Sequence, residues 1–444
     1  MKWIRKLAEP SRTADYVDLA FATATGGRPG PVVLLLPADL LLEEVPSSTT
    51  RAADLGSFPL DRFLPDAEKL DAAATLLAKA KRPLIVAGGG VHISGATEAL
   101  AELQDKAQLP VLTTVMGKGA VDESHPLSLG VAGYALGPLA PARHMRHLIQ
   151  DADVVLLVGT RTNQNGTDSW IAYPGDAKYI HVDIDASEIG RNYEALRLLG
   201  DARETLKALT QRLQGRRATD PAYRDAVADA RARHQDDMRP LFGSNHSPIR
   251  PERLMADIQR ILTKETIVVA DASYSTLWIA CYLRSLASGM RFITPRGLAG
   301  LGWGLPLALG VKVARPNSPV LAVVGDGGFA HVWSELETSR RMKLPITLIV
   351  LNNGVLAYQK DAEDVKFGQH TSACTFYPVD HSLIAKACGC RGIRVDAPGD
   401  FLPVLREALA ADVTTVIDVI TDPEAYPPIT FFEKRLEQVR ASRL

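Results

Sequence analysis

The chain of 444 residues is long enough for about three domains of roughly 150 residues each. Hydrophobic residues make up 46% of it and charged residues 23%, which excludes a disordered, collagen-like or disulfide-stapled protein. Its 50 basic and 51 acidic residues give a net charge of −1, so the chain as a whole lacks the positive field expected for binding nucleic acid or an anionic membrane.

The amino-terminal residues and the hydropathy pattern bear on the compartment. The first ten residues are too polar for the apolar core of a signal peptide, and the sequence has no run of about 18 apolar residues. We therefore expect a cytoplasmic protein. The four cysteines are too few for a disulfide framework, and Cys388-Gly389-Cys390 has no second pair of ligands at metal-binding spacing.

The first half of the chain holds a short unit and a longer one. The short unit has helical spacing over 12–24 and a buried-type strand over 32–36, and the stretch 43–63, rich in Pro, Ser and Thr, is typical of a linker. In the longer unit a glycine-rich turn over 88–90 precedes a helix near 97–107. Its apolar strands are predicted at 83–87, 110–114, 154–159 and 179–184. Such strands alternating with helices predict a parallel sheet covered on both faces.

A charged segment over 212–239 predicts a helix that connects to a third unit, which opens near Pro248. The strands predicted in this unit are 266–270, 320–324, 346–351 and 415–419. We therefore predict an α/β fold with two doubly wound parallel-sheet domains preceded by a shorter unit. The boundaries that we expect are 1–45 for the short unit, 46–65 for a linker, 66–211, 212–247 for the connecting helix, and 248–444.

The strongest chemical signal lies in the third unit. After a strand comes the turn Gly325–Gly328, then a helix predicted over 330–342, then a strand that ends at Asn352-Asn353-Gly354. Because a right-handed β-α-β crossover brings the carboxyl ends of both strands to one edge of the sheet, Asp326 and Asn353 should meet there. A carboxylate and an amide oxygen suit a hard cation such as Mg²⁺, and the amides of the glycines before the helix suit a diphosphate.

Each of these short motifs, taken alone, is more often a plain turn or loop. Their pairing across one β-α-β unit favours a ligand site. So does a second glycine-rich segment over 297–304, because four glycines in eight residues are costly to order without a close approach to a ligand.

Gly325-Asp326-Gly327, followed at this spacing by Asn352-Asn353, resembles the magnesium–diphosphate motif of thiamine-diphosphate enzymes. The flanking sequence, Gly300–Pro306 above all, narrows the resemblance to the group that contains acetolactate synthase, glyoxylate carboligase and oxalyl-CoA decarboxylase. The resemblance extends over essentially the whole chain.

This resemblance implies a site for thiamine diphosphate and Mg²⁺. It makes Asp326, the Asn353 side chain and the Val355 carbonyl the metal ligands, and Leu301 the aliphatic residue that holds the cofactor bent. The residues against which the cofactor would lie are Ala272, Ser273, Tyr274, Ser275, Gly300, Leu301, Gly325, Asp326, Gly327, Gly328, Asn353 and Val355.

The second unit resembles the central domain of the group, which holds FAD in acetolactate synthase and ADP or nothing in relatives. The resemblance rests on Gly159-Thr160-Arg161 and on residues 181–185. Asp183 or Asp185 could meet a ribose hydroxyl, but Asp185 equally suits a helix cap, and the glycines at 88–90 equally suit a plain turn. FAD is therefore an optional second cofactor.

The first unit, with Gly27–Pro31 and the strand after it, resembles only the end of the pyrimidine-binding domain of the group. The glutamate that assists proton transfer from the cofactor lies in the part without a counterpart here, so we assign no catalytic side chain to this sequence. Glu335 and Glu337, on the helix after the diphosphate turn, are poor substitutes. Two explanations stay open: a separate chain supplies that domain, or the protein is a truncated product.

We therefore expect the diphosphate-binding subunit of an oligomeric thiamine-diphosphate-dependent lyase or transferase. It would act on a 2-oxo acid, be most like acetolactate synthase, and be inactive as an isolated chain. Substrate choice would come from residues 354–359 and from 426–432, where acetolactate synthases usually carry a different sequence. The alternative is a non-catalytic scaffold or regulatory member of the family, against which the intact Asp326 and Asn353 argue. We expect neither a nucleic acid nor a membrane as partner.

Overall fold

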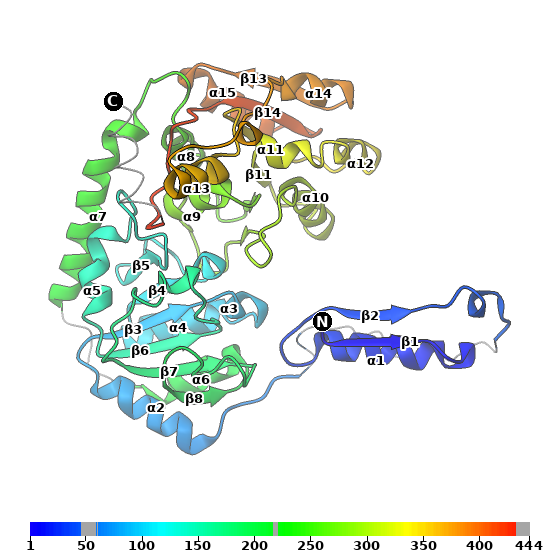
Figure 1. The fold of residues 1–444 in the computed structure, drawn as a ribbon. Coiled ribbons are helices and arrows are strands. Elements are labelled where there is room, and N and C mark those ends of the chain that lie inside the picture. The colour runs from blue at the N-terminus through cyan, green and yellow to red at the C-terminus, as the bar shows by residue number, and fades with distance from the viewer. Residues whose placement is uncertain (46–58, 60, 216–220, 432–444) are drawn as a thin grey trace.

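The computed structural model describes residues 1–45, 59, 61–215 and 221–431. Most of the expected linker, residues 46–58 and 60, lies outside the described residues, as do 216–220 and 432–444. The described chain forms two parallel-sheet units, one above the other in Figure 1, and a small amino-terminal unit beside the lower one. The prediction of two doubly wound parallel sheets is confirmed.

The lower, central unit contains a six-stranded parallel sheet in the order β5-β4-β3-β6-β7-β8. Its strands are β3 (Pro83–Ala87), β4 (Val111–Thr113), β5 (Ser128–Val131), β6 (Val154–Val158), β7 (Lys178–Asp183) and β8 (Ala195–Leu199). Its helices are α2 (Ala67–Lys79), α3 (Gly90–Ile93), α4 (Thr97–Ala107), α5 (Arg146–Gln150) and α6 (Ala202–Arg212).

The upper, carboxy-terminal unit contains a second six-stranded parallel sheet in the order β10-β9-β11-β12-β14-β13. Its strands are β9 (Ile267–Ala270), β10 (Phe292–Ile293), β11 (Val320–Gly325), β12 (Thr347–Asn352), β13 (Arg391–Val395) and β14 (Thr415–Ile420). Its helices are α8 (Pro251–Gln259), α9 (Tyr274–Tyr282), α10 (Gly304–Ala314), α11 (Asp326–Ala330), α12 (Glu335–Arg341), α13 (Ala357–Phe367), α14 (His381–Ala387) and α15 (Pro398–Leu409).

Buried side chains cover both faces of each sheet, which explains why inner strands such as β3 and β6 are continuously apolar. Along β3, for example, Leu84 and Val86 belong to the core on one face, whereas Ile85 and Ala87 belong to the core on the other. Successive side chains of a strand point to opposite faces, so a sheet covered on both sides needs apolar residues at every position.

The structure corrects two details of the sequence prediction. The helix expected over 330–342 is in fact two helices, because α11 begins directly at Asp326 and His331–Ser334 separates it from α12. The strands β5, β8, β10 and β13 were not predicted. They are short or polar and lie at or near the edges of their sheets, where an alternating or weak apolar pattern suffices.

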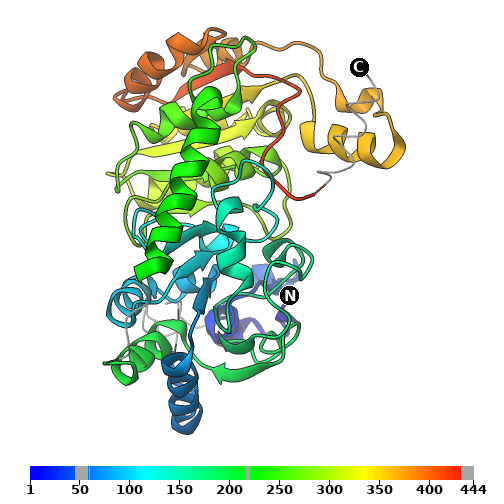
Figure 2. The same cartoon turned by 90° about the vertical axis from the view of Figure 1, so that its left-hand side faces the viewer.

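A long helix, α7 (Pro221–Phe242), runs along the side of both units (Figures 1 and 2). Val227 and Ala230 in its first half are buried in the core of the central unit, and Met238 near its end is buried in the core of the carboxy-terminal unit. The outer side of this helix is charged, whereas its inner side carries small and apolar residues that pack into both cores.

The two sheet units also meet along a buried polar seam. Lys118 and Glu123 of the central unit form an ion pair of 2.9 Å, and both side chains are almost fully buried. Glu123 in turn accepts a hydrogen bond of 3.2 Å from the backbone N–H of Ser285. Next to this contact the backbones of the two units come so close that a Cβ atom on Gly119 would stand 2.0 Å from the carbonyl oxygen of Met290.

The amino-terminal unit is a two-stranded parallel sheet, β1 (Trp3–Lys6) and β2 (Val32–Leu35), with helix α1 (Thr13–Thr25) against it. No residue of α1, β1 or β2 is buried. Large apolar side chains are exposed on this unit and on the residues after it: Ile4, Val17, Leu19, Phe21, Leu35, Leu36, Leu41 and Leu42. A parallel sheet is normally covered on both faces. This unit carries apolar side chains typical of a protein interior, yet the described residues leave them exposed.

The remaining regular elements are short 3₁₀ turns. They are η1 (Pro10–Arg12), η2 (Leu40–Leu42), η4 (Val115–Gly117), η5 (Arg143–Met145), η6 (Asn165–Thr167) and η7 (Ser372–Cys374). Among the helices that the structure describes, none combines the length and the apolar composition needed to span a lipid bilayer.

Candidate cofactor site

The carboxyl ends of β11 and β12 lie side by side, as the β-α-β argument requires, since Gly325 pairs with Leu351. Asp326, directly after β11, accepts a hydrogen bond of 2.7 Å from the N–H of Gly354, which follows β12. Its other carboxylate oxygen accepts one of 2.8 Å from Gly327 N–H. The structure thus brings Asp326 to the Asn353-Gly354 turn.

Asp326 is a buried carboxylate without a basic partner among the described residues. It is 5% exposed, and neither lysine nor arginine of the described chain forms an ion pair with it. Burial raises the pKa of Asp326 to about 6, although three backbone N–H groups lower it. A buried charge of this kind calls for a cation, and an oxygen-only donor set fits Mg²⁺ better than a softer metal.

The end of the neighbouring strand β9 supplies the next wall of the site. Ala272, Tyr274 and Ser275 are buried there, at the start of α9. Ser273 has φ +66° and ψ −144°, a region that glycine almost alone occupies, so its backbone is held under strain. The Ser275 hydroxyl donates to the carbonyl of Ala272 at 2.8 Å, so in this structure its proton is directed to the backbone of its own turn.

The glycine-rich segment before α10 forms the third wall. Leu301 projects from it and is 37% exposed, so its side chain has room for a contact from outside the chain. Gly300 is placed beside the Trp303 ring, where a Cβ would stand 2.8 Å from Nε1.

A small cavity of about 50 Å³ lies between these walls. The residues that line it include all of the predicted cofactor residues except Gly300: Ala272, Ser273, Tyr274, Ser275, Leu301, Gly325, Asp326, Gly327, Gly328, Asn353 and Val355. The volume is well below the roughly 300 Å³ at which pockets for organic ligands begin. The cavity between these walls is therefore too small to enclose an organic ligand.

The sequence prediction missed two features of this site. Asp271, at the end of β9, lines the cavity and accepts hydrogen bonds from the segment that carries Leu301. Tyr274 donates to Asp361 at 2.6 Å and packs edge-to-face against Tyr358 and Tyr426. An acidic residue directly after a buried strand is a detectable signal, whereas the cluster of tyrosines comes from three distant segments and has no signature in the sequence.

Two family models match the chain. One describes the central domain of thiamine pyrophosphate enzymes and matches residues 70–209; the other describes their C-terminal TPP-binding domain and matches residues 271–419. The probable acetolactate synthase large subunit of Methanocaldococcus jannaschii is 30% identical over 96% of this chain and 72% of its own length. The chain belongs to the thiamine pyrophosphate enzyme family.

Other relatives of this thiamine pyrophosphate enzyme carry the same kind of name. The acetolactate synthase of Arthrospira platensis is 28% identical over 95% of this chain and 73% of its own length. The large subunit of acetolactate synthase isozyme 3 of Escherichia coli is 30% identical over 88% of this chain and 68% of its own length. The predicted resemblance to acetolactate-synthase-like enzymes that use thiamine diphosphate is thus confirmed.

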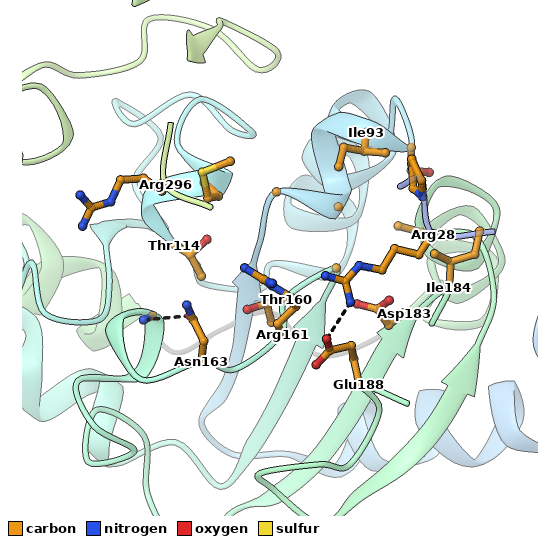
Figure 3. A pocket seen from close by; sticks show the side chains of 18 of the residues that line it. Arg28, Ile93, Thr114, Thr160, Arg161, Asn163, Asp183, Ile184, Glu188 and Arg296 are labelled. Atoms are coloured by element: carbon orange, nitrogen blue, oxygen red, sulfur yellow. Dashed lines mark hydrogen bonds and ion pairs between the residues drawn. The ribbon is translucent and has the colours of Figure 1, made fainter. Parts of the chain in front are cut away.

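The thiamine pyrophosphate enzyme has a second, larger cavity of about 410 Å³ at the carboxyl edge of the central sheet (Figure 3). Its lining includes Gly159-Thr160-Arg161, which carries the resemblance to the central domain, and Asp183, one of the two residues that could meet a ribose hydroxyl. Burial raises the pKa of Asp183 to about 6. Arg296, five residues before Leu301, lines the far end, so the same segment borders both cavities.

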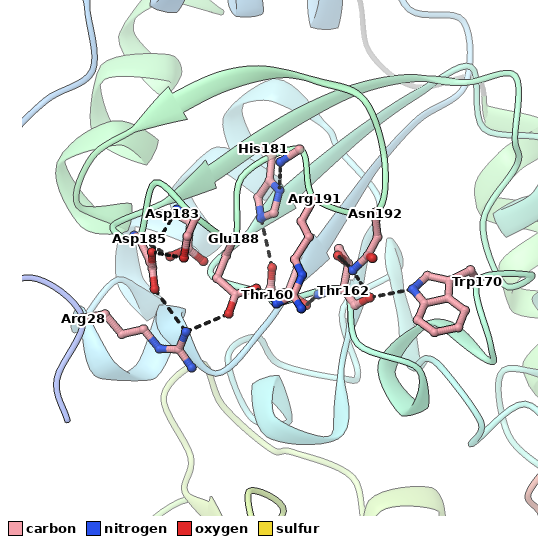
Figure 4. A network of polar contacts seen from close by, with 12 residues as sticks. Arg28, Thr160, Thr162, Trp170, His181, Asp183, Asp185, Glu188, Arg191 and Asn192 are labelled. Carbon is pink, nitrogen blue, oxygen red and sulfur yellow. Dashed lines mark hydrogen bonds and ion pairs between the residues drawn. The ribbon is translucent and has the colours of Figure 1, made fainter. Parts of the chain in front are cut away.

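A network of charges closes one side of this central cavity (Figure 4). Arg28 of the amino-terminal unit lies 3.1 Å from Asp185 and 2.7 Å from Glu188. Asp185 also accepts a hydrogen bond of 2.9 Å from the N–H of Ser187, so it caps a turn rather than a helix. The cavity is therefore shared between the central unit and the amino-terminal unit.

His181 on β7 holds the loop that borders this cavity. Its Nε2 lies 2.9 Å from the carbonyl oxygen of Thr160, and its Nδ1 accepts a hydrogen bond of 3.3 Å from Gly190 N–H. These partners require the neutral ring, and burial lowers the pKa of His181 to about 4.

This histidine predicts acid sensitivity of the central unit. The folded pKa lies below the unfolded one of about 6.5, so its stabilising contribution is complete above pH 6.5 and is lost as the pH falls towards 4. Between pH 7 and 4.5 we expect wild type to lose about 2 to 3 kcal/mol more unfolding free energy than His181→Gln. Urea unfolding at both pH values measures this. His147→Gln, at an exposed histidine on α5, serves as control, and equal losses in all three proteins would contradict the prediction.

Among the residues that the structure describes, the cysteines and histidines form no second metal centre. Within the described ranges, no group of three or more His, Cys, Asp or Glu side chains is arranged to hold a metal. All four cysteines are free thiols, and Cys281, Cys374 and Cys390 are buried.

Proposed function

We propose that this chain is the diphosphate-binding part of a Mg²⁺-dependent thiamine-diphosphate carboligase or decarboxylase that acts on a 2-oxo acid. The observation that carries the proposal is the buried carboxylate of Asp326 joined to Gly354 beside Asn353, within the region that matches the TPP-binding domain. The lyase or transferase activity and the 2-oxo acid follow from the acetolactate synthases among the relatives.

In this proposal the chain binds and orients its ligands. Asp326, the Asn353 side chain and the Val355 carbonyl would hold the metal, and the amide of Gly328 would face the diphosphate, since the Gly327 amide donates to Asp326. Thiamine diphosphate, when bound, supplies a nucleophilic carbon and an electron sink for loss of CO₂. Leu301 supports the cofactor from below, and the tyrosines around Tyr274 exclude water from the neighbouring surface.

A second polypeptide completes the proposed site. The cavity of about 50 Å³ cannot enclose an organic cofactor, and the described residues leave the apolar surface of residues 1–45 exposed. We propose that a pyrimidine-domain chain packs against these surfaces in an oligomer. Substrate choice would then come from residues 354–359 and 426–432.

For the central cavity we propose a dinucleotide, FAD being the one that the resemblance allows. Its volume of about 410 Å³ falls in the range of organic-ligand pockets, and Asp183 offers a carboxylate to a ribose hydroxyl. Gel filtration of the chain mixed with FAD tests this through the flavin absorbance of the protein peak. A flavin-free peak at millimolar FAD would contradict it.

The first test of the function is binding of the cofactor with and without metal. We expect thiamine diphosphate to bind at least about tenfold more tightly with Mg²⁺ than with a chelator, because the diphosphate and the Asp326 carboxylate repel each other unless a cation lies between them. Tryptophan fluorescence, with Trp303 beside Leu301, reports the titration. Equal affinities in both conditions would contradict the metal site, and absence of binding would favour the non-catalytic alternative.

Leu301 should matter for turnover more than for affinity. In the complex with a pyrimidine-domain chain, we expect Leu301→Ala to lower kcat by about 10- to 100-fold while the dissociation constant of thiamine diphosphate changes less than about threefold. Leu298→Ala, three residues earlier and 92% exposed, is the matched control. Normal kcat with a raised dissociation constant would show that Leu301 only packs.

A further inference from the structure

Asp271 holds together three segments that border the candidate cofactor site. It stands directly after β9, is 1% exposed, and is not among the residues that the sequence assigned to the cofactor. One of its carboxylate oxygens accepts a hydrogen bond of 3.0 Å from Gly302 N–H. The other accepts bonds of 2.7 Å from Ala272 N–H and 3.2 Å from Trp303 N–H.

The third segment that borders Asp271 is Gly325–Gly328, the segment proposed to face the diphosphate. A Cβ atom on Gly328 would stand 2.2 Å from the Asp271 carboxylate, so the glycine leaves the space that this carboxylate fills. Gly304 also lies against Asp271, where its Cβ position would stand 3.1 Å from the Asp271 Cβ, although Val324 is closer, at 2.5 Å. The glycines of both motifs are thus explained in part by one buried acidic side chain rather than by the cofactor alone.

The alternatives for Asp271 are limited by its contacts. Its two oxygens already accept three backbone N–H groups, and it forms no ion pair with a described lysine or arginine. It is therefore placed neither to transfer a proton nor to pair with a cationic substrate. What it fixes is the backbone on either side of Leu301, because Gly302 and Trp303 follow that residue directly.

We propose that Asp271 is a positioning residue, which fixes the backbone of residues 301–303 so that the surface under thiamine diphosphate is formed before the cofactor arrives. This inference rests on the proposed function. Without the carboxylate, cofactor binding would have to order the segment, and the affinity would fall. Truncation of the Leu301 side chain differs from this, because it leaves the backbone in place.

Asp271→Asn is the sharpest variant. The amide has nearly the same shape, so it still fills the space beside Gly328, but it has one oxygen in place of two. In either orientation its NH₂ group faces a backbone N–H, that of Gly302 or those of Ala272 and Trp303. Asp257→Asn is the control, because Asp257 is an equally buried carboxylate that binds Arg253 at 2.9 Å on α8, outside the cavity lining.

Two measurements on the purified chain with Mg²⁺ test the proposal. Hydrogen exchange in the ligand-free protein reports the amides of Gly302 and Trp303. Titration with thiamine diphosphate, and separately with inorganic pyrophosphate, reports binding to the whole site and to its diphosphate end. In Asp271→Asn we expect exchange at these amides and the thiamine diphosphate dissociation constant to rise about tenfold, with that of pyrophosphate changing less than about twofold. Asp257→Asn should leave all three at wild-type values.

Each of the remaining outcomes would contradict either the positioning role of Asp271 or the proposed function. Unchanged exchange and affinity in Asp271→Asn would show that the carboxylate fixes nothing. An equal loss of pyrophosphate and thiamine diphosphate affinity would show a general structural role. If wild type binds pyrophosphate but not thiamine diphosphate, the proposed function fails and the positioning role with it, while the exchange data still establish whether Asp271 holds the segment.

Discussion

Replacing Asp326 by alanine is expected to lower the affinity of the chain for thiamine diphosphate by about 100-fold at a fixed Mg²⁺ concentration. The buried carboxylate is the one charged oxygen ligand proposed for the metal, and its loss leaves the cation held by neutral groups. It also removes the acceptor that joins Gly327 to Gly354, so the two turns around the diphosphate lose their link. Isothermal calorimetry with the cofactor and Mg²⁺ measures the effect.

Two further variants separate charge from packing. Asp326→Asn retains the size of the side chain and should lie between wild type and alanine. Glu337→Ala makes the same change in net charge on α12, where the side chain is exposed and pairs with Arg341 at 2.9 Å, and it should bind as wild type does. Wild-type affinity in Asp326→Ala, with the fold intact by circular dichroism, would contradict the proposed metal site.

The purified chain alone is expected to show no decarboxylation of pyruvate or another 2-oxo acid, even when saturated with thiamine diphosphate and Mg²⁺. Removing the proton from the reactive carbon needs an acid–base partner within hydrogen-bond reach. Among the described residues, the carboxylates that line the cavity are Asp271, Asp326 and Asp422. The first two accept backbone N–H groups and the third pairs with Arg250 at 3.0 Å, so each is already engaged.

Addition of a pyrimidine-domain chain from the same organism should raise the rate of CO₂ release by about 10² to 10⁴-fold, the usual contribution of general acid–base catalysis. The complementing chain with its glutamate changed to glutamine is the control, because it can bind without restoring the proton transfer. Turnover by the single chain, free of co-purifying protein, would contradict the proposal. Binding without turnover in the restored complex would favour the regulatory alternative.

The inner strands of the two sheets could be predicted because burial on both faces leaves only apolar residue types acceptable there. Strands such as β3 and β6 are buried on both faces, so every position is apolar and the run stands out from its surroundings. The strands that were missed, such as β8 and β13, carry exposed Arg197 and Arg394 in mid-strand, since one side of an edge strand has no neighbour. Their pairing depends on tertiary context, which a local pattern does not contain.

The candidate site likewise contains residues that the sequence could bring together and residues that it could not. Asp326 and Asn353 could be brought together from the sequence, because one crossover of fixed hand connects their strands. The role of Asp271 could not, since its partners Gly302 and Trp303 lie about thirty residues away across an irregular segment. The contact of Arg28 with Asp185 and Glu188 joins residues more than 150 positions apart, and charges at that separation give no periodic signal.

The contact between the two sheet units at Gly119 and Met290 limits how chimeras of related proteins can be built. A side chain at position 119 would collide with the main chain of the other unit, and Lys118, Glu123 and Ser285 are buried around the same point. The two sheet units are consequently not interchangeable modules, although each has its own core. A chimera drawn from two relatives would have to take residues 117–123 and 285–292 from a single parent. Residues 1–45 would have to match the central unit at Arg28, which pairs with Asp185 and with the buried Glu188.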